Sequence, residues 1–165
     1  HPSMISTVYD SPIGKLTLIS DGKALAHLQF ESPRYGYPPA PAGRDAVLEL
    51  ARIELDQFFS RQRTAFSVST APQGSEFQRR CWAALQEIPY GATRSYGEQA
   101  RAIGAPKAAR AVGLANGRNP ISIIIPCHRV IGADGSLTGY GGGAARKQFL
   151  LDLEQRAGLL AQKAS

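Results

Sequence analysis

Hydrophobic and polar residues alternate near the start of the chain with the period of two that is typical of half-buried β-strands. The alternation covers residues 5–9, 16–19 and 25–30, and turn formers separate these stretches at 11–14 and 21–22. Short turns of this kind join neighbouring antiparallel strands. The pattern therefore predicts a small antiparallel sheet at the N-terminus.

The hydrophobic period lengthens after a proline-rich stretch, residues 33–43, which we interpret as a loop. Between Val47 and Phe59 the apolar residues recur at the spacing of an amphipathic helix, and its apolar face could cover the sheet. The sheet and this helix would form one unit that ends near Val68. Turn formers cluster over residues 70–74, so we place a subdomain boundary there.

A second unit begins with a helical pattern over residues 77–88, and Ser75 with Gln78 fits a capping box at its start. Two shorter helical patterns follow, at 96–103 and 107–116, with a break between them that contains glycine and proline. Such a tight break is typical of a helix-turn-helix, in which the second helix would face DNA.

The chain changes character after these helices. Residues 123–125 form an apolar, strand-like run that stops at Pro126 and that we expect to be buried. Residues 129–132 and 137–139 flank turn formers at 133–136, which predicts a hairpin or wing.

Two further elements complete the expected fold. Residues 141–143 are consecutive glycines and must be loop, whereas 146–156 has helical spacing, with Gly158 placed to end the helix. The sequence predicts an α+β protein with an N-terminal sheet-and-helix subdomain over 4–70. A mainly helical C-terminal subdomain with a winged helix-turn-helix would occupy 75–160.

Composition narrows the class of protein. The hydrophobic fraction of 43% over 165 residues is ordinary for a globular chain. No apolar run reaches the roughly 20 residues that a membrane helix needs, and the N-terminus lacks a secretory profile. We therefore expect a soluble, cytoplasmic protein without a membrane partner. We interpret residues 1–3, which precede Met4, as a remnant of an expression tag.

The net charge of +6 lies in the C-terminal half, because residues 1–74 hold equal numbers of basic and acidic side chains. Between Tyr90 and Val130 several basic residues face a single acid, Glu98. The basic residues are Arg94, Arg101, Lys107, Arg110, Arg118 and Arg129. This pattern is expected where a polyanion binds. Charge alone leaves a merely solvated basic face equally open.

Cysteine and histidine are few. Two cysteines, and three histidines without paired spacing, give little reason to expect a metal site. Cys81 falls on the apolar face of its helix and is interpreted as structural. Cys127 lies between Pro126 and the pair His128 and Arg129. A neighbouring base or cation makes a thiolate nucleophile available, but from the residues alone an inert buried thiol is about as well supported.

The segment Pro126-Cys127-His128-Arg129-Val130 resembles the active-site signature of the O6-alkylguanine-DNA alkyltransferases, also called methylated-DNA–protein-cysteine methyltransferases. Further motifs stand in the family's order and spacing. They are Arg94-Ser95-Tyr96-Gly97-Glu98, Ala108-Ala109-Arg110-Ala111-Val112-Gly113, Asn116-Gly117-Arg118-Asn119-Pro120 and Gly139-Tyr140-Gly141-Gly142-Gly143. The similarity is dense over 75–154 and looser before that, where it rests on Asp10-Ser11-Pro12-Ile13-Gly14 and the strand-helix pattern. It implies a ribonuclease-H-like N-terminal subdomain.

The resemblance implies DNA repair by direct reversal. A stand-alone, bacterial-type monomer would bind double-stranded DNA, flip out O6-alkylguanine, mainly O6-methylguanine, and move the alkyl group irreversibly onto Cys127 in a single turnover without a cofactor or metal. His128 would take the thiol proton through a water, and Glu154 would orient His128. Without the resemblance, Glu154 would be interpreted as an exposed helix acid. Asn119 would tie the DNA-binding helices to the active-site turn.

The family also implies how DNA is held. Arg110 would enter the base stack and fill the space left by the flipped guanine, and Tyr96 would lie beside the flipped nucleotide. Further DNA contacts are expected from Arg94, Lys107, Arg118 and Ala109. The alkylguanine pocket would involve Tyr140, Val130 and Gly141.

The chain departs from some relatives in one respect that concerns the pocket. Gly141 stands where these relatives have a serine, which leaves tolerance of bulky adducts in doubt. Zinc ligands reported for some relatives, and the additional four-cysteine domain of the adaptive-response forms, have no counterparts in the sequence. Two rival functions are a damage recogniser that does no chemistry, whose known relatives replace the cysteine, and a hydrolase with a Cys-His pair.

Overall fold

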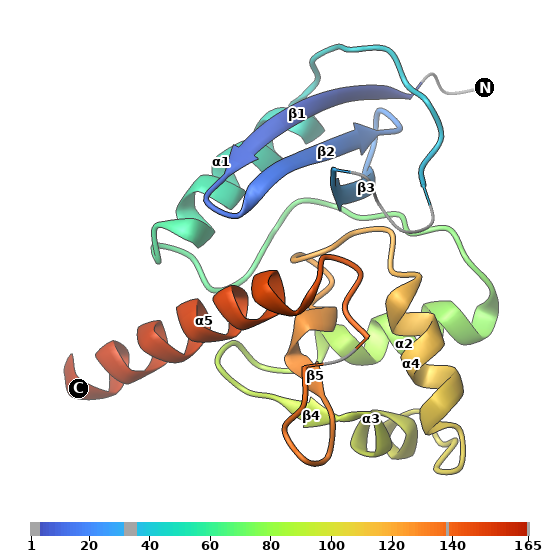
Figure 1. The fold of residues 1–165 in the computed structure, drawn as a ribbon. Coiled ribbons are helices and arrows are strands. Elements are labelled where there is room, and N and C mark those ends of the chain that lie inside the picture. The colour runs from blue at the N-terminus through green and yellow to red at the C-terminus, as the bar shows by residue number, and fades with distance from the viewer. Residues whose placement is uncertain (1–3, 32–35, 138, 165) are drawn as a thin grey trace. The chain divides into compact units, whose positions relative to one another are not determined.

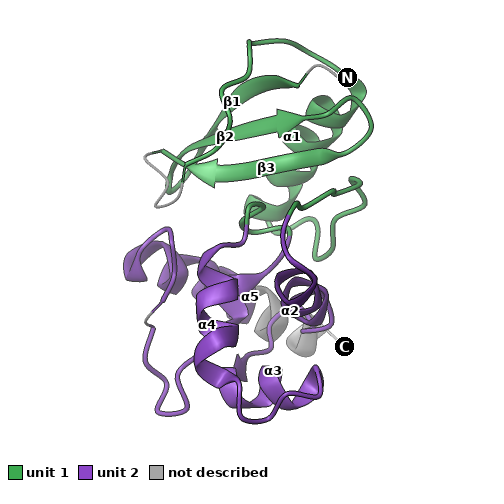
Figure 2. Ribbon diagram, turned by 90° about the vertical axis from the view of Figure 1, so that its right-hand side faces the viewer, with its two compact units in different colours: residues 1–73, 120–124 green, residues 74–119, 125–165 purple. Residues whose placement is uncertain are grey.

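A computed structural model describes residues 4–31, 36–137 and 139–164 of the chain. The interpretations made for residues 1–3, for part of the proline-rich loop and for Thr138 lie outside the described residues. The chain divides into two units (Figure 2): His1–Gln73 with Pro120–Ile124, and Gly74–Asn119 with Ile125–Ser165. The boundary near residue 73 lies where turn formers cluster, whereas nothing in the sequence pattern indicated that residues 120–124 would lie with the first unit.

An antiparallel sheet forms the first unit, in the order β1 (Ile5–Ser11), β2 (Gly14–Ser20) and β3 (Leu25–Phe30). Tyr9, Leu16 and Phe30 lie side by side across the three strands and are buried. Residues in register on neighbouring strands share a face of the sheet, so these side chains mark the face that is covered. The predicted strands are confirmed.

Helix α1 (Ala46–Phe59) lies along the sheet (Figure 1), as its amphipathic pattern predicts. Asp45 caps its start, because the side chain accepts the Leu48 amide at 2.8 Å. From β1, the Tyr9 hydroxyl donates to Asp56 of the helix at 2.6 Å. Phe58, near the end of the helix, is fully buried.

The apolar run at residues 123–125 is buried, but the prediction that it is strand-like is wrong. The backbone turns there, and Ile123 has φ 70°, in the left-handed region. The residues just before the run join the edge of β3: the Leu28 amide donates to the Pro120 carbonyl at 2.9 Å, and the Ser122 amide donates to the Leu28 carbonyl at 2.8 Å. Burial explains the apolar composition here, and composition alone does not separate a buried turn from a buried strand.

Helices dominate the second unit. They are α2 (Glu76–Gln86), α3 (Tyr96–Ala102), α4 (Ala109–Gly117) and α5 (Ala144–Ala164). The predicted capping box of Ser75 and Gln78 is present, and Ser95 with Glu98 forms a second one at α3. Helix α4 starts two residues later than Lys107, the expected start.

Buried polar side chains fix α2, α3 and α4 against one another. Gln99 of α3 donates at 3.0 Å both to the Cys81 carbonyl of α2 and to the Asn116 side chain of α4. Asn116 returns a hydrogen bond to Gln99 at 2.7 Å. Because buried polar groups need partners, this pair specifies how the helix-turn-helix packs. Cys81 is fully buried, as its place on an apolar face predicts.

Two further expectations require correction. The strand β5 (Val130–Ile131) follows the short helix η1 (Cys127–Arg129), but it pairs in parallel with β4 (Arg94–Ser95) and not with a hairpin partner. Residues 132–136 form the predicted turn without a returning strand among the described residues that follow. Helix α5 continues through Gly158 to Ala164, because one glycine among good helix formers costs only about 1 kcal/mol.

Candidate active site

The reactive thiol of the sequence analysis lies on η1, directly after the turn at 123–126. Cys127 is 8% exposed, and its amide donates to the Ile125 carbonyl at 2.8 Å. Pro126 precedes the helix and supplies the carbonyl that the Arg129 amide contacts at 3.0 Å. The turn therefore presents the sulfur on a short, internally bonded segment.

Asn119, just beyond the end of α4, holds this segment. Its side-chain nitrogen donates to the Ile125 carbonyl at 2.8 Å and to the Cys127 sulfur at 3.2 Å. The amide thus joins the helix-turn-helix to the active-site turn and places an N–H dipole on the sulfur. A hydrogen bond of this kind stabilises a thiolate.

Glu154 of α5 is 1% exposed, and two neighbouring side chains of η1 contact its carboxylate. His128 Nε2 lies 2.7 Å from Glu154 Oε2. Arg129 donates through Nε to Oε1 at 2.8 Å and through a terminal nitrogen to Oε2 at 2.9 Å, and its other terminal nitrogen donates to the Ile88 carbonyl at 2.8 Å. The carboxylate is therefore clamped from two sides.

Burial and charge set the protonation of this group. Burial acts to raise the pKa of Glu154, but hydrogen bonds and charge from His128 and Arg129 outweigh it and hold that pKa below its usual value. Burial lowers the pKa of His128, and Glu154 opposes this effect. At neutral pH these directions favour a carboxylate beside a neutral imidazole.

The tautomer follows from the hydrogen bond. A carboxylate can only accept, so Nε2 must carry the ring proton and Nδ1 must carry the lone pair. Among the described residues, none gives Nδ1 a hydrogen-bond partner although that atom is buried. His128, next to Cys127 in the chain, thus carries a lone pair on Nδ1 that could accept a proton.

Opposing effects act on the protonation of the Cys127 thiol. Burial raises the pKa of Cys127, whereas the Asn119 hydrogen bond and the charge of Lys147 lower it. Lys147 of α5 is 1% exposed, and its ammonium lies 6.0 Å from the centre of the Tyr96 ring. Our sequence analysis missed both Lys147 and the role of Arg129 as a partner of Glu154, because neither is marked by spacing.

Small residues surround Tyr96, the half-buried first residue of α3. Gly139 has φ 79°, and a Cβ there would lie 3.0 Å from the tyrosine hydroxyl. Gly113 of α4 lies close to the same ring. Burial raises the pKa of Tyr96, and Cys127 contributes in the same direction. Of the expected pocket residues, Val130 is buried, Tyr140 is half-buried and Gly141 is exposed.

The expected DNA-binding residues lie on and around the helix-turn-helix. Lys107, Arg110 and Arg118 are exposed, whereas Arg94 and Ala109 are half-buried. Arg129 was counted in the basic surface, and this was wrong, because it is 7% exposed and paired with Glu154. Its charge belongs to the active site.

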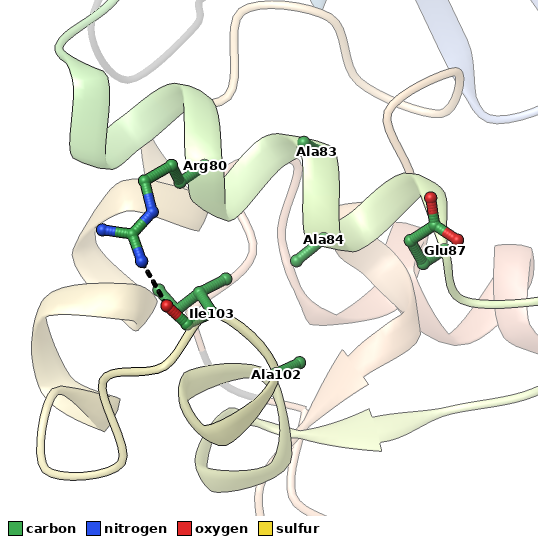
Figure 3. Close-up of a pocket in the computed structure, with 6 residues that line it drawn as sticks. All are labelled: Arg80, Ala83, Ala84, Glu87, Ala102 and Ile103. Carbon is green, nitrogen blue, oxygen red and sulfur yellow. Dashed lines mark hydrogen bonds between the residues drawn. The ribbon is translucent and has the colours of Figure 1, made fainter.

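Within the described ranges, no group of three or more His, Cys, Asp or Glu side chains could hold a metal ion. A shallow hollow between α2 and α3 (Figure 3) is lined by three alanines and Ile103, with Arg80 and Glu87 at its sides, and shares no residue with the site of Cys127. Arg80 is already engaged there with the Ile103 carbonyl. No helix in the described part of the chain is long and apolar enough to cross a membrane.

A helix-turn-helix joined through Asn119 to a buried Cys-His-Glu group defines the class of protein as one that acts on DNA through a thiol. Comparison with known families agrees. Residues 4–72 match the ribonuclease-like domain of 6-O-methylguanine DNA methyltransferase, and residues 76–156 match its DNA-binding domain. The chain belongs to this family of DNA repair methyltransferases, and its enzyme class is that of the methylated-DNA–protein-cysteine methyltransferases.

Individual relatives are similar over nearly their full length. A methylated-DNA–protein-cysteine methyltransferase of Mycolicibacterium paratuberculosis is 55% identical over 152 residues, which cover 89% of this chain and 90% of the relative. One from Methanosarcina acetivorans is 48% identical, with 92% and 98% covered. The crystal structure of Mycobacterium tuberculosis OGT in complex with DNA is similar with a TM-score of 0.86 at 50% identity, and 94% of each chain is covered. The predicted fold class and family are thereby confirmed.

Proposed function

We propose that the protein flips an O6-alkylguanine, mainly O6-methylguanine, out of duplex DNA and transfers the alkyl group irreversibly to Cys127. The observation that carries this proposal is the buried pair of His128 and Glu154 beside a thiol that Asn119 contacts at 3.2 Å. A merely structural cysteine needs neither an adjacent oriented base nor an amide donor on its sulfur.

In the proposed step His128 Nδ1 accepts the thiol proton through a bridging water, and Glu154 stabilises the imidazolium that forms. The thiolate attacks the alkyl carbon, so that the S–C bond forms as the C–O6 bond breaks. The electron pair passes to guanine, which takes up the proton and becomes an ordinary base. Atoms and charge balance without a metal or cofactor.

The product explains why each molecule would react once. A thioether has no good leaving group, and no step restores the thiol. The protein would therefore be consumed in stoichiometric amounts.

DNA binding is proposed to run through the basic surface of the second unit. Lys107, Arg110 and Arg118 are exposed, and with Arg94 and Ala109 they would contact the duplex near its phosphates. The similarity to an OGT solved in complex with DNA supports DNA binding, and the exposed cations favour this surface for it. We expect the protein to act as a monomer and in the cytoplasm, where it meets DNA.

Base extrusion would place guanine against Tyr140, Val130 and the loop at Gly141, with Tyr96 beside the flipped nucleotide. Unstacking a base costs a few kcal/mol. The planar guanidinium of Arg110 would offset part of this cost by filling the gap in the stack.

Intact-mass measurement after incubation with a methylated duplex tests the proposal. We expect one methyl group per protein molecule on Cys127, no gain for Cys127→Ser and an ordinary gain for Cys81→Ser, which removes the other buried thiol. Methylation of Cys81 instead, or repair of several lesions per molecule, would contradict it. Tight binding of the damaged duplex without any mass gain would indicate a damage recogniser.

A further inference from the structure

One large apolar side chain on α4 lies in solvent. Leu114 is 65% exposed, more than the other exposed large hydrophobic residues of the described chain. Burying such a side chain is favourable, so its exposure on a helix proposed to bind DNA points to a contact with the bound partner. We propose that Leu114 is an apolar DNA-contact residue, which packs on sugar and base carbons of the duplex next to Arg110.

Helix geometry places the two residues together. Leu114 follows Arg110 by four residues, so the two side chains lie on the same face of α4, about one turn apart. The opposite face carries the core-facing residues of this helix, Val112, Ala115 and Asn116. Leu114 therefore contributes nothing to the packing of the helix-turn-helix that would explain a leucine there.

Leu114 projects from this face into solvent. Its neighbour Gly113 instead lies against the Tyr96 ring, where an added Cβ would be 3.6 Å from the ring carbons. A projecting leucine would then reach past the phosphates to the carbon-rich sugars and base edges.

Charge identifies duplex DNA as the partner. The exposed cations Lys107, Arg110 and Arg118 surround Leu114 along the chain, and the protein carries a net charge of +6. A second copy would bring these like charges together, whereas a duplex offers phosphates around an apolar groove wall. The proposal rests on the DNA binding in the proposed function and adds a contact that is apolar.

The salt dependence of binding separates an apolar contact from an ionic one. Each neutralised phosphate contributes roughly 0.9 to the slope of log affinity against log salt, whereas an apolar contact contributes nothing to it. Leu114→Ala should therefore weaken duplex binding roughly tenfold at every salt concentration with the slope unchanged. Arg118→Ala should reduce the slope.

Two further variants complete the experiment. Leu114→Met keeps an apolar side chain of similar size and should bind within about twofold of the unmodified protein. Ile53→Ala removes an apolar residue that is 48% exposed on α1 of the other unit and should leave DNA affinity unchanged. Melting temperatures of all variants are measured as a control for folding. Alanine is a good helix former, so Leu114→Ala should not destabilise α4.

Unchanged affinity of Leu114→Ala would overturn the proposal, as would a slope change equal to that of Arg118→Ala. A loss of self-association, seen by light scattering, together with unchanged DNA affinity would assign Leu114 to a protein contact instead. The proposed function fails separately, when the unmodified protein binds a methylated duplex but gains no mass. A protein that does not bind duplex DNA would overturn both.

Discussion

Arg129 illustrates at the scale of a single residue how burial changes the meaning of a charge. In the sequence it is one of several basic residues near a helix-turn-helix. In the structure Arg129 donates two hydrogen bonds to Glu154 and one to the Ile88 carbonyl. Its guanidinium carbon lies 5.6 Å from the centre of the Tyr90 ring. Arg129 is therefore expected to affect the thiol through Glu154 and His128, and not to bind DNA.

Replacement of this arginine should change the pH dependence of repair. Without its charge the pKa of Glu154 should rise, because Arg129 helps to hold it down, and the pKa of His128 should rise as well, because Arg129 acts to lower it. With both pKa values raised, His128 and Glu154 would each become protonated at a higher pH. In Arg129→Met the acid limb of the rate against pH should therefore move upward, with at least about a tenfold loss at pH 7.

Single-turnover mass gain across a pH series measures this effect. Arg79→Met, which replaces an exposed arginine of α2, is the matched control and should behave like the unmodified protein. A uniform loss of rate with an unmoved pH profile would mean that Arg129 only stabilises the fold. Circular dichroism identifies a variant that has not folded, and Arg129→Lys, which keeps the charge, should then recover part of the profile.

Helix α4 is the element that carries a proposed DNA-binding residue and also leads to the candidate active site. Its inward face packs through Val112 and Asn116, its outward face carries Arg110, and its C-terminal end leads to Asn119 on the active-site turn. One short helix thus connects the proposed base-extrusion residue with the residue that touches the thiol. Substitutions on its two faces should have different consequences.

Arg110→Ala should slow repair of a methylated duplex while it keeps most of the reaction with free O6-methylguanine base, which needs no extrusion. Unstacking costs a few kcal/mol, and about 1.4 kcal/mol is already tenfold in rate, so a loss of tenfold or more is expected on duplex alone. Mass gain over time with both substrates provides the comparison. Equal losses on duplex and free base would show that Arg110 instead holds the active site together.

The distribution of charge is a property of the whole molecule. The first unit holds equal numbers of basic and acidic side chains, so the excess of +6 belongs to the second, where the helix-turn-helix lies. Long-range attraction for a polyanion should then come from one unit only. The position of a charged side chain should therefore affect DNA affinity more than the net charge of the protein does.

DNA affinity should accordingly fall steeply with salt, with a slope near 0.9 for each phosphate contact. Lys107→Ala should lower that slope by roughly one contact, whereas Lys15→Ala, an exposed lysine of β2, should leave it unchanged. Fluorescence anisotropy at several salt concentrations measures both. An affinity that does not depend on salt would exclude the basic surface as the DNA-binding site.

Local chemistry made much of the fold predictable. The strands of the first unit, the capping box at Ser75 and the helices of the helix-turn-helix all follow from spacing and end signals within short windows. The family motif around Cys127 indicated a candidate nucleophile for the same reason, because its residues are adjacent. Such features depend on neighbours in sequence, which a sequence displays directly.

The tertiary structure alone decided what depends on distant partners. The parallel pairing of β4 with β5 joins segments that are remote in the chain, and so does the ion pair of Arg129 with Glu154. The turn at Ile123 could not be predicted for another reason, because a buried turn and a buried strand have the same apolar composition. Lys147 counts as a neighbour of the thiol only because α5 packs beside η1. The sequence by itself determined the local elements and the motif, whereas packing determined burial, and burial sets the pKa values by which Cys127, His128 and Glu154 would act together.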